Sequence, residues 1–155
     1  MSAARILLLV DTPNLYRSAT QRYGPGTRID YRAFRQTIGQ TGRCHCEAMV
    51  NDGVSPGVVE YLSRLHYAVT YSHARDCDEM LIARAVALHR SADSVIVASG
   101  DGKNIELIRL LKTAGKHAFV AGITGSIHHG LREVADAVIE FPVLIERNCK
   151  GSQAA

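Results

Sequence analysis

The sequence predicts an α/β fold in which helices cover both faces of a mainly parallel β-sheet. Apolar runs rich in β-branched residues alternate with helix-period patterns along the chain, which is the order of elements in a series of βαβ units. The two clearest runs, residues 6–10 and 95–98, are apolar without interruption. Strands that are buried on both faces have this composition, so we expect both runs in the middle of the sheet.

Length and composition indicate one domain. A chain of 155 residues, 46% hydrophobic and 21% charged, is long enough for one α/β core and short for two. We assign residues 1–146 to the domain and residues 147–155 to a fraying C-terminal tail. The longest apolar run is too short for a membrane span, and the four cysteines form no CxxC pair. We therefore expect a cytoplasmic protein with reduced thiols and no membrane partner.

Strands and helices alternate in the N-terminal half at clear turn signals. Pro13 follows the first apolar run and favours the start of a helix. Asp30 and Gly42 bracket a second helix as its N-cap and its stop. The predicted elements are a strand at 5–10, a helix at 15–22, a loop at 23–27, a helix between Asp30 and Gly42, a strand at 44–50, a helix at 56–65 and a strand at 67–71.

The C-terminal half continues the alternation. Its first helix opens with three acids, of which Asp76 or Asp78 could serve as the N-cap. The glycines of residues 99–102 form the exit loop of the clearest strand. The predicted elements are a helix at 80–89, a strand at 94–98, a helix at 105–111, a strand at 117–121, a helix at 127–134 and a strand at 138–141.

Four acids fall where parallel strands would bring them together. Asp11 ends the first strand, Asp101 follows the strand at 94–98, and Asp78 and Glu79 open a helix. The carboxyl ends of parallel strands share one sheet edge, and Mg²⁺ commonly takes one or two carboxylates directly while keeping its waters. We favour Asp78 over Glu79 as the direct ligand, because adjacent helical positions point about 100° apart.

Two uncharged polar residues accompany these acids. The Asn14 amide could hold a metal-bound water or a phosphate oxygen, and the Ser99 hydroxyl could bind a phosphate oxygen. A purely structural interpretation stands beside each: Asp11 and Asn14 are also favoured turn and capping residues. Residues 99–102, Ser-Gly-Asp-Gly, could likewise be a turn whose glycines only supply positive φ.

Three further patterns favour structure over chemistry. The segment Cys44-His45-Cys46 looks like half of a zinc site, but a strand would place its histidine on the face opposite the two cysteines. His128 and His129 are expected to diverge on a helix and to face solvent. Asp136 precedes the last predicted strand, so it belongs to the sheet edge opposite the four acids.

Together these motifs resemble the NYN domain family of PIN-like ribonucleases over about residues 5–141. The shared features are the first strand with Asp11 and Asn14, Asp78 at a helix start, the strand at 95–98 with its SGDG exit, and the ending at residues 135–139. The resemblance implies a PIN-like three-layer sandwich and a ribonuclease that depends on Mg²⁺ or Mn²⁺. It carries family roles over to Asp11, Asn14, Asp78, Ser99 and Asp101.

The chain departs from many bacterial NYN members at acidic positions. Those members read SGDGDF and carry another Asp six positions after the helix-opening acid, where this chain has Lys103, Asn104 and Arg84. Lys103 and Arg84 could take the metal's place electrostatically and leave a phosphate-binding pocket without catalysis. Regnase-type ribonucleases instead pair two acids at this helix, similar to Asp78 and Glu79, and on that comparison the site is complete.

Two functions follow from these residues. The leading hypothesis is a metal-dependent ribonuclease, endonucleolytic in action, and the alternative is a catalytically degenerate PIN-like module that binds RNA or a protein. The predicted acids are Asp11, Asp78 and Asp101 for catalysis and metal binding, with Glu79 as a further metal ligand, and the predicted substrate contacts are Asn14, Arg75, Ser99 and Lys103. A net charge of +3 permits an RNA partner, single-stranded or structured, without demanding one. A homodimer through an apolar helix face is a further expectation.

Overall fold

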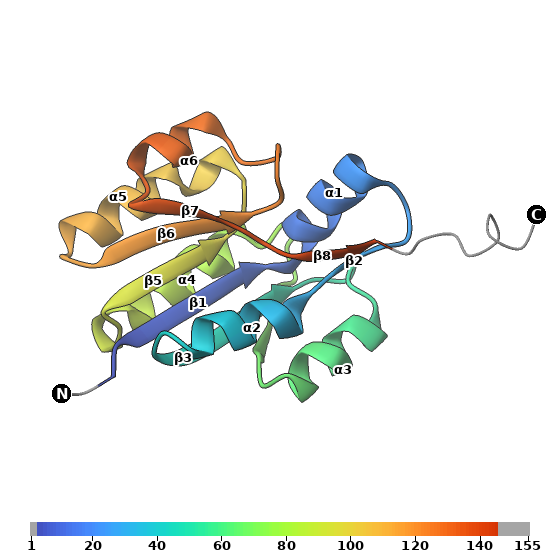
Figure 1. Cartoon of the computed structure of the whole chain (residues 1–155), viewed down its shortest axis with the longest axis horizontal. Coiled ribbons are helices and arrows are strands. Elements are labelled where there is room, and N and C mark those ends of the chain that lie inside the picture. Colours follow the sequence, from blue (N-terminus) through green and yellow to red (C-terminus); the bar gives the residue numbers. More distant parts are fainter. Residues whose placement is uncertain (1–2, 146–155) are drawn as a thin grey trace, which may run out of the picture.

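The computed structural model describes residues 3–145, which form one parallel sheet between two helical layers (Figure 1). The sheet has six strands in the order β4-β3-β1-β5-β6-β7, and all neighbours in it run parallel. The bounds are β1 Arg5–Asp11, β3 Arg43–Val50, β4 Ala68–Tyr71, β5 Ser94–Ala98, β6 His117–Gly122 and β7 Ala137–Glu140. The predicted α/β fold is confirmed, and the chain folds as a single domain.

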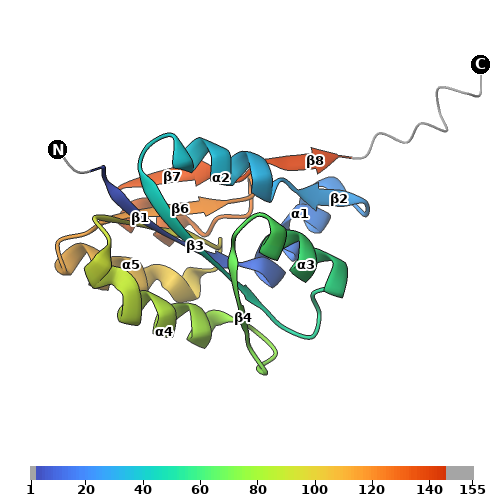
Figure 2. The ribbon, with the colours of Figure 1, turned by 90° about the horizontal axis from the view of Figure 1, so that it is seen from below.

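Helices cover both faces of the sheet, as Figure 2 shows for α2 and α3 on one side and α4 and α5 on the other. The bounds are α1 Thr12–Tyr23, α2 Tyr31–Gly39, α3 Pro56–Arg64, α4 Asp78–Leu88, α5 Ile105–Thr113 and α6 His129–Val134. Leu8 and Val10 of β1 pack in the core on the α1, α2 and α3 side, whereas Leu7 and Leu9 pack against α4, α5 and α6. This division explains why β1 is apolar at successive positions.

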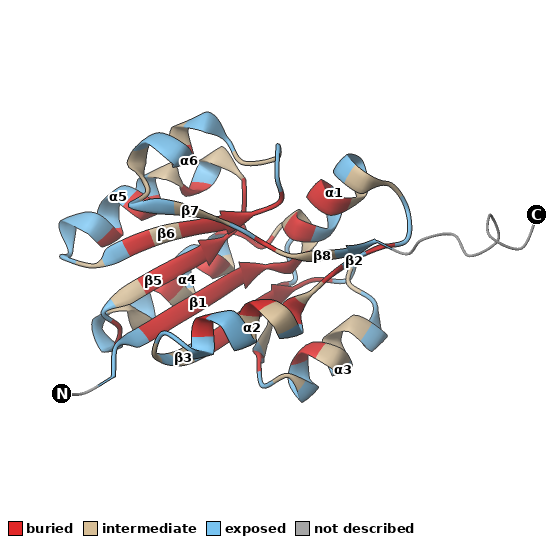
Figure 3. Cartoon of the chain, in the orientation of Figure 1, coloured by how far each residue is buried: buried red, intermediate tan, exposed pale blue. Residues whose placement is uncertain are grey.

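β1 and β5 run through the buried centre of the molecule (Figure 3). The last paired residue of β5 is Ala98, which lies opposite Val10, and Asp11 lies opposite Met49 of β3. The carboxyl ends of these three strands therefore stop at nearly the same level. The residues that follow them in the sequence are brought to one sheet edge, as the prediction for the acids requires.

Two short strands were not predicted from the sequence. β2, Thr27–Ile29, pairs antiparallel with β8, Val143–Ile145, and the pair forms a separate two-stranded sheet. The loop predicted at residues 23–27 is thus two residues too long, because Tyr23 still belongs to α1 and Thr27 already belongs to β2. Three residues are too few to show a period, and their pairing partner lies more than a hundred positions away.

Helices α1 and α4 begin earlier in the sequence than predicted, and both begin next to the acids. α1 begins at Thr12 because the Asp11 carboxylate accepts a hydrogen bond from the backbone N–H of Asn14, 3.2 Å away. α4 begins at Asp78 after Cys77, whose side chain makes no capping bond, so neither Asp76 nor Asp78 is its N-cap. Within residues 3–145 no helix is long and apolar enough to cross a membrane. The predicted tail at 147–155 lies outside the described residues.

Candidate metal and nucleic-acid site

Asp11 and Asp78 are buried carboxylates at the carboxyl edge of the sheet. Asp11 is the last residue of β1 and is 3% exposed, and Asp78 is the first residue of α4 and is 8% exposed. Asp101 follows β5 and is half-buried. Burying two carboxylates beside a third is costly, so such a site favours positive charge nearby.

The acids interact electrostatically, as the pKa of Asp11 shows. Burial is the largest cause that raises the pKa of this carboxyl above its usual 3.8, and the backbone N–H of Asn14 opposes the rise. The charges of Asp78 and Asp101 raise the pKa further, while the guanidinium of Arg17 lowers it. Three sequence-distant carboxylates therefore lie within Coulombic range of one another.

Asn14 ties the first helix to the loop after β5. Its Oδ1 accepts a hydrogen bond from the backbone N–H of Gly100, 3.1 Å away and 86 positions along the chain. A methyl group on Gly100 would meet the carbonyl oxygen of Ser126 at 2.1 Å, so only glycine fits this crossing. The amide predicted to contact substrate thus also fixes the position of Asp101 relative to Asp11.

Ser99 lies inside the loop rather than on its surface. The side chain is fully buried, and its Oγ accepts hydrogen bonds from the backbone N–H of Asp101 at 3.3 Å and from Nδ2 of Asn104 at 3.2 Å. Asp101 in turn caps the short 3₁₀ helix Gly102–Asn104 by accepting from the backbone N–H of Lys103 at 2.9 Å. Ser99 is therefore placed to shape the loop that presents Asp101.

Of the two cations in place of family acids, Lys103 reaches the site and Arg84 does not. The Nζ of Lys103 lies 3.2 Å from Oδ2 of Asp78 and 3.8 Å from Oδ2 of Asp76, and Asp78 is the main cause that raises the pKa of this lysine. Arg84 instead donates to both carboxylate oxygens of buried Glu47, at 2.7 and 2.8 Å. The suggestion that Arg84 replaces a metal is wrong, because Glu47 holds it on the β3 face.

The predicted metal ligands do not form a closed cage. Among residues 3–145, no group of three or more His, Cys, Asp or Glu side chains lies close enough together to hold a metal ion. Glu79 is exposed beside Asp78, on the next position of α4. The metal-binding roles of Asp11, Asp78, Glu79 and Asp101 therefore stay predictions.

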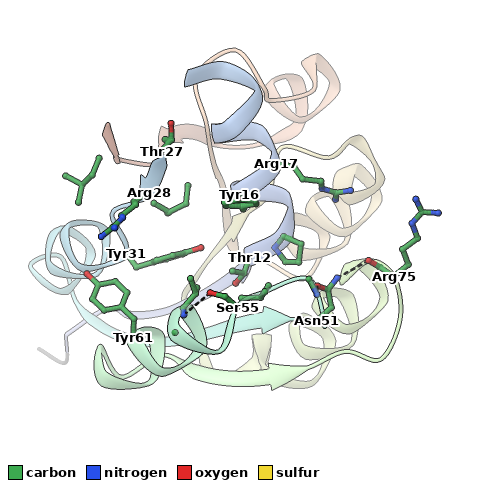
Figure 4. A pocket seen from close by; sticks show the side chains of 17 residues that line it. Thr12, Tyr16, Arg17, Thr27, Arg28, Tyr31, Asn51, Ser55, Tyr61 and Arg75 are labelled. Carbon is green, nitrogen blue, oxygen red and sulfur yellow. Dashed lines mark hydrogen bonds between the residues drawn. The ribbon is translucent and has the colours of Figure 1, made fainter. Parts of the chain in front are cut away.

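A cavity of about 850 Å³ is lined by Thr12 and Pro13, the two residues that follow Asp11 in the chain, and Figure 4 shows it from close by. α1, β2, the start of α2, the segment 51–61, Arg75 and Leu144 of β8 contribute to its lining. Asn51 fixes one wall, because its Nδ2 donates to the backbone oxygen of Arg75 at 2.9 Å and its Oδ1 accepts from Gly53 at 3.0 Å. Asn51 was not among the predicted site residues, although its place directly after β3, at the same sheet edge, was an available signal.

Of the other sequence candidates, the Cys44–Cys46 segment is on β3, whereas His128 lies against the loop of Asp101, where its backbone N–H donates to the Gly100 oxygen at 2.9 Å. The Sγ atoms of Cys44 and Cys46 are 3.1 Å apart, and His45 faces Glu47 on the other side of β3, as expected. The rings of His128 and His129 are exposed but stack with centroids 4.4 Å apart, so the expectation that they diverge is wrong. His128 precedes α6 as its N-cap, which frees its ring from helical spacing.

Comparisons with known proteins support the same fold. The family model of the NYN domain matches residues 5–145, and NYN domains belong to the PIN-like superfamily. A Vibrio parahaemolyticus protein of unknown function has a similar structure, with a TM-score of 0.82 and 21% identity over 90% of this chain and 94% of that one. At this identity the likeness shows the fold alone.

Two further comparisons carry no functional argument. The enoyl reductase CurK aligns with a TM-score of 0.42 and 17% identity over 97% of this chain and 39% of its own. No curated protein matches the sequence. The family match covers nearly the whole chain, and it agrees with the parallel sheet and the acids at its edge. This chain belongs to the NYN domain family.

Proposed function

We propose that this protein is a metal-dependent ribonuclease that cleaves RNA endonucleolytically at the edge formed by Asp11, Asp78 and Asp101. The observation that carries the proposal is the placement of Asp11, Asp78 and Asp101 at one sheet edge, where the charges of Asp78 and Asp101 add to the burial that raises the pKa of Asp11 to about 6. Such a set favours a bound cation. NYN domains are generally associated with RNA, and PIN-like nucleases generally use divalent metals.

The residues fit Mg²⁺ or Mn²⁺ by their chemistry. Oxygen donors suit both ions, and Mg²⁺ needs only one or two direct carboxylates, so the lack of a closed cage among the described residues is compatible with a water-rich ion. Asp11, Asp78 and Asp101 would hold the ion, with Glu79 reaching it through water. A metal bound there would lower the pKa of water and stabilise charge on the phosphate.

The chain's own residues supply positioning. Asn14 fixes the loop that carries Asp101 to the start of α1, and Ser99 holds the same loop from inside. Lys103 is exposed and near the acids, so it can neutralise a phosphate once it leaves Asp78. Arg75 lies at the cavity rim, where it can contact the RNA backbone.

The test is a cleavage assay with a labelled circular RNA in Mn²⁺, Mg²⁺ or EDTA. Linear product in metal alone, lost in Asp101→Asn, is the predicted result, and a circular substrate makes the cut endonucleolytic by definition. Asparagine keeps the capping acceptor of Asp101, so the variant retains its loop. Asp93→Asn is the matched control, because Asp93 pairs with Arg5 away from the site. Full activity in Asp101→Asn would overturn the assignment.

A second candidate function has its own observation. Because Lys103 already lies 3.2 Å from Asp78, it can neutralise the acids without a metal, as a noncatalytic RNA-binding module would require. RNA binding in EDTA without turnover in any metal would favour that module.

A further inference from the structure

We infer that the cavity beside Asp11 is a pocket for one unpaired nucleobase of an RNA strand. The inference deepens the proposed function, on which it rests, by assigning the cavity as a binding site for a base next to the phosphate that is cleaved. Position is the first argument: Thr12 and Pro13 line the cavity and directly follow Asp11 in the chain. A strand whose phosphate lies at the acids would thus carry its neighbouring bases past the cavity mouth.

Aromatic side chains make the cavity suitable for a base. Tyr16 lines it while remaining 58% exposed, and Tyr61 and Tyr31 line it from α3 and α2 (Figure 4). Every base has a π-face that stacks on such rings. The volume of about 850 Å³ falls within the usual range of ligand pockets.

Charge at the rim favours an anionic ligand. Arg17 and Arg75 both line the cavity, and Figure 4 shows them on the same side of it. Arg17 is also close enough to Asp11 to interact with its carboxylate. The cationic rim therefore faces the acidic edge, and a phosphate can bridge the two regions while its base occupies the cavity.

A buried hydroxyl supplies the polar contact. Thr12 is 2% exposed, and its Oγ1 makes no hydrogen bond of normal geometry with any described residue. Its polar neighbour is the Tyr31 hydroxyl, also at the cavity. A buried hydroxyl without a partner costs free energy, and the edge of a base offers both donors and acceptors to it.

The pocket selects against paired bases. A base in a duplex is stacked on both faces and hydrogen-bonded at its pairing edge, so it cannot enter the cavity without being extruded. Asn51 holds the Arg75 carbonyl and the Gly53 N–H, so this wall is already formed before a ligand binds. A preformed wall reduces the ordering cost of binding.

The test measures RNA binding in EDTA by fluorescence anisotropy, with one labelled RNA of about eight nucleotides offered single-stranded or in a duplex. Wild type is expected to prefer the single strand. Tyr16→Ala should weaken single-strand binding by roughly 5- to 100-fold, the range for one stacked base. Tyr71→Ala is the matched control, because Tyr71 is a similarly exposed tyrosine outside the cavity lining. It should leave binding unchanged.

Thr12→Val provides a second variant that keeps shape and removes the hydroxyl. It should weaken binding while leaving the melting temperature close to that of wild type, since the Thr12 hydroxyl makes no hydrogen bond of normal geometry with any described residue. Equal binding by wild type, Tyr16→Ala and Thr12→Val would overturn the pocket. So would a change of oligomeric state in Tyr16→Ala with unchanged RNA binding, which would identify a protein surface. The assay contains no metal and scores no cleavage, so its outcome is separate from that of the ribonuclease test.

Discussion

The ammonium nitrogen of Lys103 lies 3.2 Å from Oδ2 of Asp78, one of the carboxylates proposed to bind a metal ion. The contact joins the loop after β5 to the first residue of α4. Lys103 would therefore compete with a metal ion for the Asp78 carboxylate. Its side chain is 63% exposed, so it can move without disturbing the core.

Replacing the lysine should strengthen metal binding. In Lys103→Met the Asp78 carboxylate is freed, and we expect Mn²⁺ to bind up to about 5-fold more tightly, the scale of an exposed ion pair. Isothermal titration with Mn²⁺ in the absence of RNA measures this directly. Lys112→Met is the control, because that lysine pairs with Asp136 at the opposite edge. Weaker Mn²⁺ binding in Lys103→Met would mean that the lysine supports the site.

The buried carboxyl of Asp11 should make the metal-free protein less stable as pH rises. Its pKa is raised from 3.8 to about 6 in the folded state. The folded protein therefore binds the extra proton between these values, and stability falls as pH increases through that window. Asp11→Asn should raise the unfolding free energy by on the order of 1–3 kcal/mol at pH 7.

Urea unfolding in EDTA at several pH values checks this prediction. The advantage of Asp11→Asn should disappear below about pH 4, where both states are protonated. Asparagine preserves the N-cap acceptor for Asn14, so helix α1 is not the variable. A variant less stable than wild type at pH 7 would contradict the raised pKa of Asp11 and its main cause, burial.

Arg84 should matter for stability and not for catalysis. Its removal in Arg84→Met leaves the buried Glu47 carboxylate with only the partly exposed His45. We expect a loss of about 2–3 kcal/mol, below the range for fully buried pairs because the Arg84 side chain is 35% exposed. The double variant Glu47→Gln/Arg84→Met should recover most of this lost unfolding free energy, measured by chemical denaturation. Loss of cleavage in a folded Arg84→Met protein would place Arg84 in the site after all.

Gly100 and Gly39 should respond oppositely to alanine. A Cβ at Gly100 meets the Ser126 carbonyl oxygen at 2.1 Å, so Gly100→Ala must shift the loop and stretch the bond to Asn14. A Cβ at Gly39, in the last turn of α2, meets nothing within 4 Å. Thermal melts should give Gly100→Ala a lower melting temperature than wild type. Gly39→Ala should melt at a higher temperature, because its unfolding free energy should rise by about 0.5–1 kcal/mol. Equal melting temperatures for both variants would show that the loop around Gly100 can accommodate a Cβ without cost.

Sequence reasoning recovered the main sheet because its strands carry their own signals. Uninterrupted apolar runs located β1 and β5, and the strand-end rule placed Asp11 and Asp101 at one edge. It also placed Asp136 correctly, at the amino end of the strand Ala137–Glu140, where its carboxylate accepts from the Ala118 N–H.

The cavity could not be predicted in the same way. Its lining includes Thr27 and Ile29 of β2 and Leu144 of β8, strands of three residues that pair across the chain. Neither strand shows a detectable hydrophobic period in the sequence. The part of the cavity lining that β2 and β8 form therefore could not be predicted. The partners of Lys103 and Arg84 were likewise undetermined, because long side chains choose among acids only once the fold has placed them.

The most direct test of the account is Mn²⁺ binding, measured by the loss of the free-ion electron paramagnetic resonance signal, in wild type, Asp78→Asn and Asp93→Asn. We predict that wild type and Asp93→Asn bind Mn²⁺ alike and that Asp78→Asn binds it at least about 10-fold more weakly, the low end for losing part of a metal site. Equal binding by all three proteins, or none by wild type at millimolar Mn²⁺, would contradict a metal site at Asp11, Asp78 and Asp101.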